Sequence, residues 1–265
     1  MNERRNPKRF DKRQNTAPAE EIEGQLEGRN ALQEALRSGR TIDKVFIASG
    51  ETDRGLQRLA AEAKEAGAVV VPVDRRKLDA MSFTKAHQGV ITLAAAHEYC
   101  TIDDILEEAA SRGENVLIVI CDELTDPHNL GAIMRSAECA GAHGVIIPKR
   151  RSVGLTATVA KASAGAVEYM KVARVTNINN AINELKEKGV WIFGTAAEGS
   201  IPMYKADLTG PAAIVIGNEG DGMSPLVRKN CDVTVNIPMR GRISSLNASA
   251  AASILLYEAV RQRIG

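Results

Sequence analysis

Aromatic residues make up only 3% of this 265-residue chain, which has one tryptophan, four tyrosines and four phenylalanines. So few rings exclude a surface on which successive bases of a single strand stack as the main way of binding nucleic acid. The chain also lacks any apolar run near the roughly 20 residues that cross a bilayer, and its first residues are charged rather than apolar. These absences predict a cytoplasmic protein with no membrane anchor.

Cysteine is scarce as well. Cys100, Cys121, Cys139 and Cys231 lie far apart, and none of them belongs to a C-x-x-C pair. The four histidines show no metal-ligand spacing with them, so the sequence predicts no metal site. Isolated cysteines of this kind are typical of reduced thiols with a structural role.

Charge is nearly balanced overall, at +1, but it is unevenly distributed. Residues 1–15 hold six Lys and Arg against two acidic residues, and residues 1–22 show no hydrophobic period. We expect this segment to be a disordered basic tail, either a solvated leader or an arm for nucleic acid. The remaining length and the 44% of hydrophobic residues are enough for two modest cores, which predicts two domains.

The first predicted domain spans residues 23–98 and alternates helix and strand patterns. Apolar residues recur on one helical face in residues 28–39 and again in 55–67, and each pattern ends at a glycine. Strands are expected at residues 44–49, 69–73 and 89–96. The pattern predicts a small α/β domain.

The second predicted domain spans residues 99–265. A polar helix at 101–113 leads into the apolar run 115–124, which is typical of a central parallel strand covered on both faces. Similar buried strands are expected at 144–148, 190–196 and 212–217, and a long helix runs from about residue 246 to 263. This part of the chain is therefore predicted to be an α/β domain with a parallel sheet.

Three segments follow buried strands in the second domain, at the position where open α/β sheets bind ligands. In the first segment, Asp126 to Asn129 form a predicted turn and helix N-cap, and Arg135 lies further along the same helix. Taken alone, Arg135 would be read as an ordinary cation on a helix surface.

The second segment carries Gly217, Gly220 and Gly222. These glycines permit either a tight turn or the close approach of the backbone to a ligand, and their spacing differs from the G-x-G-x-x-G dinucleotide motif.

The third segment carries Ser244, Ser245 and Asn247 as predicted capping side chains, followed by alanines that allow close packing. Taken alone, it would be read as a well-capped core helix.

Together the three segments are far more specific than any one of them. The chain has N-x-G-A-I-x-R-x-A at 129–137, I-G-N-E-G at 216–220, and I-P-M followed by S-S-L-N-A-S within 237–249. Over residues 115–263 it resembles the SpoU family of the SPOUT superfamily, and its EGRNALQEAL and AHQGV segments resemble that family's substrate-binding domain. The resemblance implies a trefoil-knotted α/β methyltransferase domain at 99–265, preceded by a small α/β RNA substrate-binding domain at 23–98. A knot breaks the usual rule for chain connections, and no hydrophobic period could predict it.

The resemblance also implies an activity. Enzymes of this family transfer a methyl group from S-adenosylmethionine to a ribose 2′-hydroxyl of RNA and form homodimers through the catalytic domain. Within the family, the chain is most similar to enzymes that act on a guanosine of large-subunit ribosomal RNA. The alternatives are the same chemistry on transfer RNA or another ribosomal site, or a non-catalytic RNA-binding protein of ribosome assembly.

Residues that match the family's cofactor positions provide backbone groups able to read an adenine edge and short or apolar side chains that leave room for its ring. They are Thr195, Ala196, Gly217, Asn218, Gly220, Ile237, Met239 and Leu246.

The matching catalytic positions are Asn129, Arg135, Glu219, Ser245 and Asn247. Because a guanidinium group stays protonated in proteins, we expect Arg135 mainly to stabilise the developing alkoxide or a neighbouring phosphate. The resemblance suggests that Glu219 orients Arg135 or its loop, and that the two asparagines hold ribose or cofactor hydrogen bonds.

Cations expected to contact RNA phosphates without reading sequence are Arg29, Lys149, Arg150, Arg151 and Lys161. The segment around residues 149–161 could equally be an ordinary solvated loop. Selection of the target is expected to come from the small domain, which would recognise RNA shape.

Overall fold

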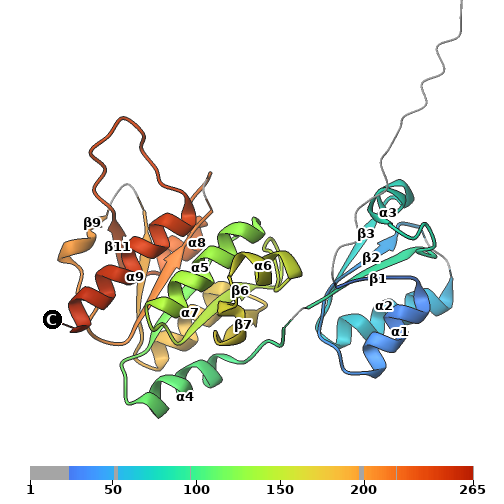
Figure 1. The fold of residues 1–265 in the computed structure, drawn as a ribbon, viewed down its shortest axis with the longest axis horizontal. Coiled ribbons are helices and arrows are strands. Elements are labelled where there is room, and N and C mark those ends of the chain that lie inside the picture. The colour runs from blue at the N-terminus through green and yellow to red at the C-terminus, as the bar shows by residue number, and fades with distance from the viewer. Residues whose placement is uncertain (1–23, 51–52, 96, 197–199, 219, 265) are drawn as a thin grey trace, which may run out of the picture.

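The computed structural model describes residues 24–50, 53–95, 97–196, 200–218 and 220–264. The predicted basic tail at 1–22 and the predicted catalytic residue Glu219 lie outside the described residues. The chain forms two lobes, each built on its own sheet (Figure 1). In the described part of the chain, every helix is too short or too polar to cross a bilayer.

The smaller lobe contains a four-stranded sheet in the order β1-β4-β2-β3. Strands β2 and β3 are parallel, whereas β4 runs antiparallel to both of its neighbours. Helices α1 and α2 cover one face, where Leu32 and Leu56 are buried against Val45, and α3 covers part of the other face through Leu78. The elements are β1 (Gln25–Glu27), α1 (Arg29–Arg37), β2 (Ile42–Ala48), α2 (Arg54–Glu65), β3 (Val69–Val73), α3 (Arg75–Met81) and β4 (Val90–Ala94).

The larger lobe contains a seven-stranded, entirely parallel sheet in the order β7-β6-β5-β10-β8-β11-β9. Its strands are β5 (Leu117–Cys121), β6 (Gly144–Pro148), β7 (Val172–Val175), β8 (Trp191–Thr195), β9 (Ile201–Pro202), β10 (Ala212–Ile216) and β11 (Val233–Asn236). Its helices are α4 (Ile102–Arg112), α5 (Pro127–Cys139), α6 (Ala157–Ala162), α7 (Ile178–Glu187), α8 (Pro225–Asn230) and α9 (Ala248–Ile264). The parallel α/β fold predicted from the buried strands is confirmed.

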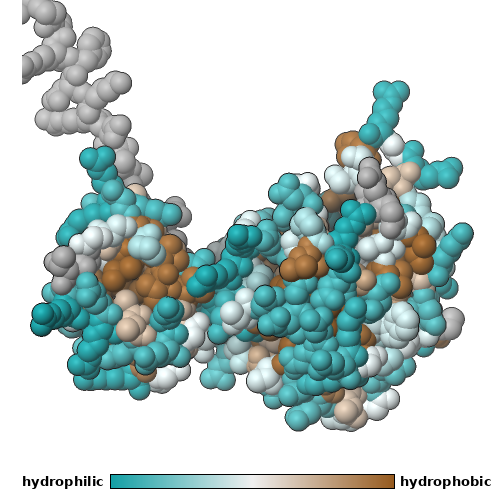
Figure 2. All heavy atoms as spheres, turned by 180° about the vertical axis from the view of Figure 1, so that it is seen from behind, coloured by the Kyte–Doolittle hydropathy of each residue, from teal (hydrophilic) through white to brown (hydrophobic). Residues whose placement is uncertain are grey.

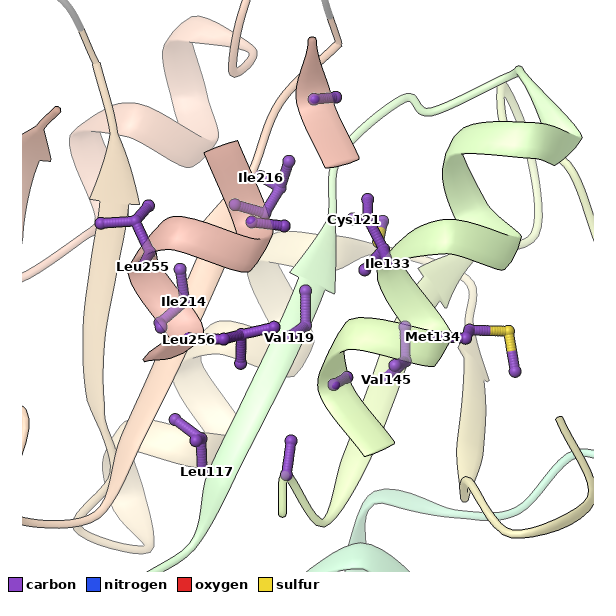
Figure 3. Close-up of a cluster of buried hydrophobic side chains, with 14 of the residues drawn as sticks. Leu117, Val119, Cys121, Ile133, Met134, Val145, Ile214, Ile216, Leu255 and Leu256 are labelled. Carbon is purple, nitrogen blue, oxygen red and sulfur yellow. The ribbon is translucent and has the colours of Figure 1, made fainter. Parts of the chain in front are cut away.

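Burial on both faces explains the continuous apolar runs of the central strands. Along β5, Leu117 and Val119 point into a core cluster formed with α5 and α9, whereas Ile118 and Ile120 point into a second cluster formed with α4 and α7. Figure 3 shows the first cluster, with side chains from α5 and α9 packed over β5 and β10. Alternation between two apolar layers thus makes every residue of β5 buried.

The N-termini of helices α5 and α9 fix the positions of residues that the sequence motifs identified. At α5, Asp126 Oδ1 accepts a hydrogen bond from the His128 amide (3.0 Å), and Pro127 takes the first helical position. The N-cap predicted within residues 126–129 is therefore Asp126. At α9, Asn247 Oδ1 accepts from the Ser249 amide (3.0 Å).

The last helix, predicted from about residue 246 to 263, is confirmed to within two residues. The predicted capping by Ser244 and Ser245 was wrong. Helix α9 begins at Ala248, and both serines are exposed before it. Asn247 immediately precedes the first helical turn, so its side chain reaches the unpaired amides there and the serines are too far back along the chain.

The two lobes contact each other through a buried ion pair. Arg174 of β7 lies 2.8 Å from Asp43 of β2, and both side chains are less than one-tenth exposed. Arg174 also donates to the Asp43 main-chain oxygen (2.7 Å), and the Tyr99 hydroxyl donates to Asp43 Oδ1 (2.7 Å). These contacts join strands of the two separate sheets.

His143 is a buried histidine of the larger lobe. Its side chain is buried, Nδ1 accepts a hydrogen bond from the Leu117 amide (3.0 Å), and Nε2 lies 3.0 Å from Glu114. Burial lowers the pKa of His143 below its ordinary value of 6.5, although Glu114 offsets part of this effect.

We predict that the free energy of unfolding falls as the pH is lowered from about 7 to 5, because the unfolded chain takes up the His143 proton before the folded chain does. The measurement is urea unfolding across that range, for the wild type and for His143→Gln, whose side chain does not titrate. The variant should show a shallower dependence on pH. An unchanged slope in the variant would assign the effect to other groups.

Candidate functional site

Two adjoining cavities lie where β8, β10 and β11 end. The first, of about 360 Å³, is lined by the ends of β8 and β11 and by one side of α9. The second, of about 390 Å³, is lined mainly by the segment that follows β10. Both cavities are lined by Thr195, Ala196, Ser245, Leu246 and Ala251. Their position at the carboxyl edge of a parallel sheet is the usual place for a ligand in this fold class.

The structure brings together all the residues that the sequence assigned to the cofactor. Thr195, Ala196 and Leu246 line both cavities. Of the other predicted cofactor residues, Ile237 and Met239 line only the first cavity. Gly217, Asn218 and Gly220 line only the second cavity. Volumes of this size suit a nucleoside-sized ligand, with a largely apolar wall in the first cavity and a mixed polar and apolar wall in the second.

Gly217 lines the second cavity and packs closely against the main chain of its own segment. A Cβ atom on this residue would lie 2.2 Å from the main-chain carbon of Gly222 and 2.2 Å from the Met223 nitrogen. The segment folds back on itself through two 3.1 Å hydrogen bonds between the main chains of Asn218 and Gly222. Asn218 Oδ1 also accepts from the Gly220 amide (2.9 Å). The segment is therefore both a tight turn and part of a cavity wall.

Asp122 supports this turn from the neighbouring strand, and the sequence analysis missed it. Its buried Oδ2 accepts a hydrogen bond from the Ser224 amide (2.7 Å), which joins the end of β5 to the segment after β10. An acidic residue directly after a buried strand is a signal that could have identified it.

The thiol next to Asp122 is chemically quiet. Burial, and to a smaller extent Asp122, raises the pKa of Cys121 to about 12. All four cysteines are free, and in the described ranges no group of three His, Cys, Asp or Glu side chains could hold a metal ion.

Three of the five predicted catalytic residues lie near one another. Asn247 Nδ2 donates a 2.8 Å hydrogen bond to Asn129 Oδ1, which joins the starts of α9 and α5. Asn129 is buried, and Ser245 lines both cavities just before Asn247. The pairing fixes the orientation of both amide groups beside the cavities.

Arg135 is not part of this group. It is exposed on α5, six residues and about 9 Å of helix rise beyond Asn129. Among the described residues that line the two cavities, Arg135 is absent. The expected contact between Arg135 and Glu219 stays a prediction, since Glu219 is outside the described residues.

The predicted RNA-contact residues lie in several places rather than in one patch. Arg29 forms an ion pair with Asp53 (2.9 Å) in the smaller lobe. Arg151 forms one with Glu123 (2.9 Å) and lines a third cavity, next to the second. Lys161 is exposed on α6, and Lys149 and Arg150 line a cleft between the lobes.

A parallel α/β lobe with ligand cavities at its strand ends, preceded by a small α/β lobe, defines the class of two-domain α/β proteins that bind a ligand at a sheet edge. The family model described as the SpoU rRNA Methylase family matches residues 115–257, which is more than half of the chain. A second model, described as RNA 2′-O ribose methyltransferase substrate binding, matches residues 25–100. The chain belongs to the SpoU family, so it is an RNA methyltransferase with the SPOUT fold, and its N-terminal lobe is the substrate-binding domain.

Curated relatives are similar over most of their length. A protein of Bacillus subtilis strain 168, provisionally named as the TrmH family tRNA/rRNA methyltransferase YacO, is 47% identical over 236 residues, covering 89% of this chain and 94% of the relative. A similarly named protein of Staphylococcus aureus strain COL is 44% identical over 236 residues, covering 89% of this chain and 95% of that protein.

Solved structures agree with this assignment. The SpoU methyltransferase AviRb from Streptomyces viridochromogenes, in complex with AdoMet, is 27% identical, with a TM-score of 0.58 over 91% of this chain and 90% of AviRb. An AdoMet-bound rRNA methyltransferase from Sinorhizobium meliloti is 26% identical, with a TM-score of 0.57 over 89% of this chain and 86% of that chain. S-adenosylmethionine is the cofactor. The largely apolar wall of the first cavity and the mixed polar and apolar wall of the second, beside the turn closed by Asn218 and Gly222, fit it.

We predict that Gly217→Ala lowers the affinity for S-adenosylmethionine by at least about tenfold, because the added methyl group must push apart the main chain at residues 222–223. Titration calorimetry measures the affinity, and thermal unfolding measures the cost to stability. Gly210→Ala is the matched control, since a Cβ there meets nothing within 4 Å. Equal affinity in the wild type and Gly217→Ala would mean that this turn does not shape the cofactor site.

Proposed function

We propose that this protein transfers the methyl group of S-adenosylmethionine to a ribose 2′-hydroxyl of RNA, on a guanosine of large-subunit ribosomal RNA. The observation that carries the proposal is the Asn129–Asn247 hydrogen bond beside Ser245, at the edge of cavities lined by the family's cofactor positions. We further propose that residues 23–98 recognise the RNA and that residues 99–265 carry out the transfer.

The bound cofactor supplies an electrophilic methyl group on its sulfonium. Transfer to a hydroxyl then needs an aligned oxygen, and that oxygen must lose a proton. Asn129 and Asn247 are held by each other, so they offer ribose or cofactor groups hydrogen-bonding atoms at defined positions. Ser245 is exposed at the mouth of both cavities and is positioned to contact the substrate.

Arg135 acts in this proposal as a fixed positive charge for the developing alkoxide or a neighbouring phosphate. Its exposed position on α5 suits contact with bound RNA rather than with the cofactor. Glu219 is proposed to orient Arg135 or its own loop.

The proposal that the target is a guanosine of ribosomal RNA rests on the resemblance of the sequence motifs. The names of the relatives include both tRNA and rRNA. Mapping 2′-O-methylation across total RNA from cells with and without the protein separates these targets. Loss of a single methylated guanosine in large-subunit RNA is the expected result. If a transfer RNA methylation is lost instead, the proposed reaction stands but its substrate is transfer RNA. If no methylation is lost, the result favours a non-catalytic role in ribosome assembly.

We predict that Arg135→Ala lowers the rate of methyl transfer by about 10² to 10³, because loss of one charge-stabilising group typically costs this much. Affinity for S-adenosylmethionine should stay within about twofold, since Arg135 does not line the described cavities. Single-turnover assays at saturating RNA give the rate, and Lys205→Ala, which removes an exposed cation elsewhere on the lobe, is the control. Normal turnover of the Arg135 variant would remove this residue from the mechanism.

We also propose a homodimer formed through the catalytic domain, as the family resemblance implies. Light scattering at the concentration of the activity assay should give about twice the 28.4 kDa mass of one chain. An active species with the mass of one chain would contradict this.

A further inference from the structure

A fourth cavity, of about 460 Å³, forms a cleft between the two lobes. One wall comes from the end of α2 and the start of β3 in the smaller lobe. The other comes from Lys149, Arg150 and Thr176, which follow β6 and β7 in the larger lobe. The cleft is therefore complete only when both lobes are present.

The charge of this cleft has one sign. Its charged lining residues, within the described part of the chain, are Lys64 from the smaller lobe and Lys149 and Arg150 from the larger lobe. The other lining residues are small, apolar or uncharged, so these cations have no acidic neighbour in the cleft wall. Three cations facing one cleft create a site for a polyanion, and a chain of phosphodiesters is the polyanion that an RNA methyltransferase meets.

A glycine allows the two lobes to approach each other here. Gly67 has a φ of +90°, and a Cβ on it would lie 3.4 Å from Lys149 Nζ. The ammonium group of one lobe therefore lies close to the backbone of the other. A side chain at position 67 would narrow the cleft beside Lys149.

The walls of the cleft are held by the buried contacts between the lobes. Besides its ion pair and hydrogen bonds with Asp43, Arg174 lies over the Tyr99 ring, 5.2 Å from the ring centre. The Tyr99 hydroxyl in turn accepts a hydrogen bond from the Leu155 amide (2.8 Å). A Cβ on Gly154 would lie 2.3 Å from Asp43 Oδ2, so the segment before α6 packs tightly against β2. A cleft held in this way binds a ligand without first having to assemble.

The cleft also leads toward the cofactor site. Lys149 and Arg150 line the cleft, and the next residue, Arg151, lines the third cavity. That cavity shares Asn218 and Asp221 with the second cofactor cavity. Consecutive residues thus connect the lobe junction to the cavity beside the proposed methyl-transfer site, where Arg151 is paired with Glu123 and Asp221 adds a second acidic side chain. Figure 2 shows strongly hydrophilic side chains along the junction of the lobes, beside an apolar patch on the smaller lobe.

We propose that the phosphodiester backbone of the RNA substrate lies in this cleft, and that Lys64 is a contact residue of the smaller lobe that acts together with Lys149 and Arg150. The proposal rests on RNA being the substrate and adds the path that the RNA takes. The smaller lobe then holds the RNA next to the larger lobe instead of binding it at a distant site. The cleft supplies affinity and position, and it does not read base identity.

The test compares the full-length charge-reversal variants Lys64→Glu and Lys149→Glu with the wild type. The probe is large-subunit ribosomal RNA transcribed in vitro, and its affinity is measured at several salt concentrations. Each variant should bind the RNA at least about tenfold more weakly. The slope of log affinity against log salt concentration should become shallower by about one, which corresponds to the loss of about one phosphate contact. Affinity for S-adenosylmethionine, measured by calorimetry, should not change.

Two further variants guard against trivial explanations. Lys64→Arg keeps the charge and should retain binding, as expected if the positive charge at this position contacts the phosphates. Lys205→Glu reverses an exposed charge outside the cleft and should bind RNA normally. Wild-type affinity in both cleft variants would overturn the proposed path even if the wild type methylates ribose. If the wild type binds RNA through the cleft but no ribose is methylated, the path stands and the proposed chemistry fails.

Discussion

The pairing of β10 with β5 on one side and β8 on the other is the constraint on which the catalytic lobe depends. It places a strand from late in the chain between two earlier strands, so that three strand ends from distant segments become neighbours. Parallel strands all direct their carboxyl ends to the same edge, and the segments after β8, β10 and β11 meet there. β11 joins them by pairing with β8. Both cavities exist because of this convergence, and all of their described lining residues belong to the larger lobe.

Much of the fold could be predicted because the hydrophobic period reports burial directly. Strands β3 and β6 were predicted at their observed residues, and β8 and β10 to within one residue at each end. Strands β1, β7, β9 and β11 were missed, since two to four residues are too few to show a period. The order of the strands depends on pairing between distant segments, and no local pattern encodes it.

The sequence could predict which residues belong to the candidate site, but it could not predict which of them contact one another. Small and polar residues after buried strands identified the three segments, yet the hydrogen bond between Asn129 and Asn247 joins positions 118 apart. Arg135 shares a motif with Asn129 but lies further along α5, where its side chain is exposed. A motif gives the spacing of residues along the chain, and it does not show toward which neighbours their side chains point. Asp43 and Arg174, 131 residues apart, gave no signal, since each is an ordinary charged residue until the lobes meet.

Helix α9 links the ligand site to the folding of the whole larger lobe. Ala251 and Leu255 of α9 line the first cavity, and Arg263 near its end donates hydrogen bonds to the main-chain oxygens of Asn115 and Gly210 (2.7 Å each). Asn115 and Gly210 lie just before β5 and β10, so the helix crosses the sheet from its carboxyl edge to its amino edge. A ligand in the first cavity meets α9 only when the helix is packed across the sheet, so binding there stabilises the folded lobe against unfolding.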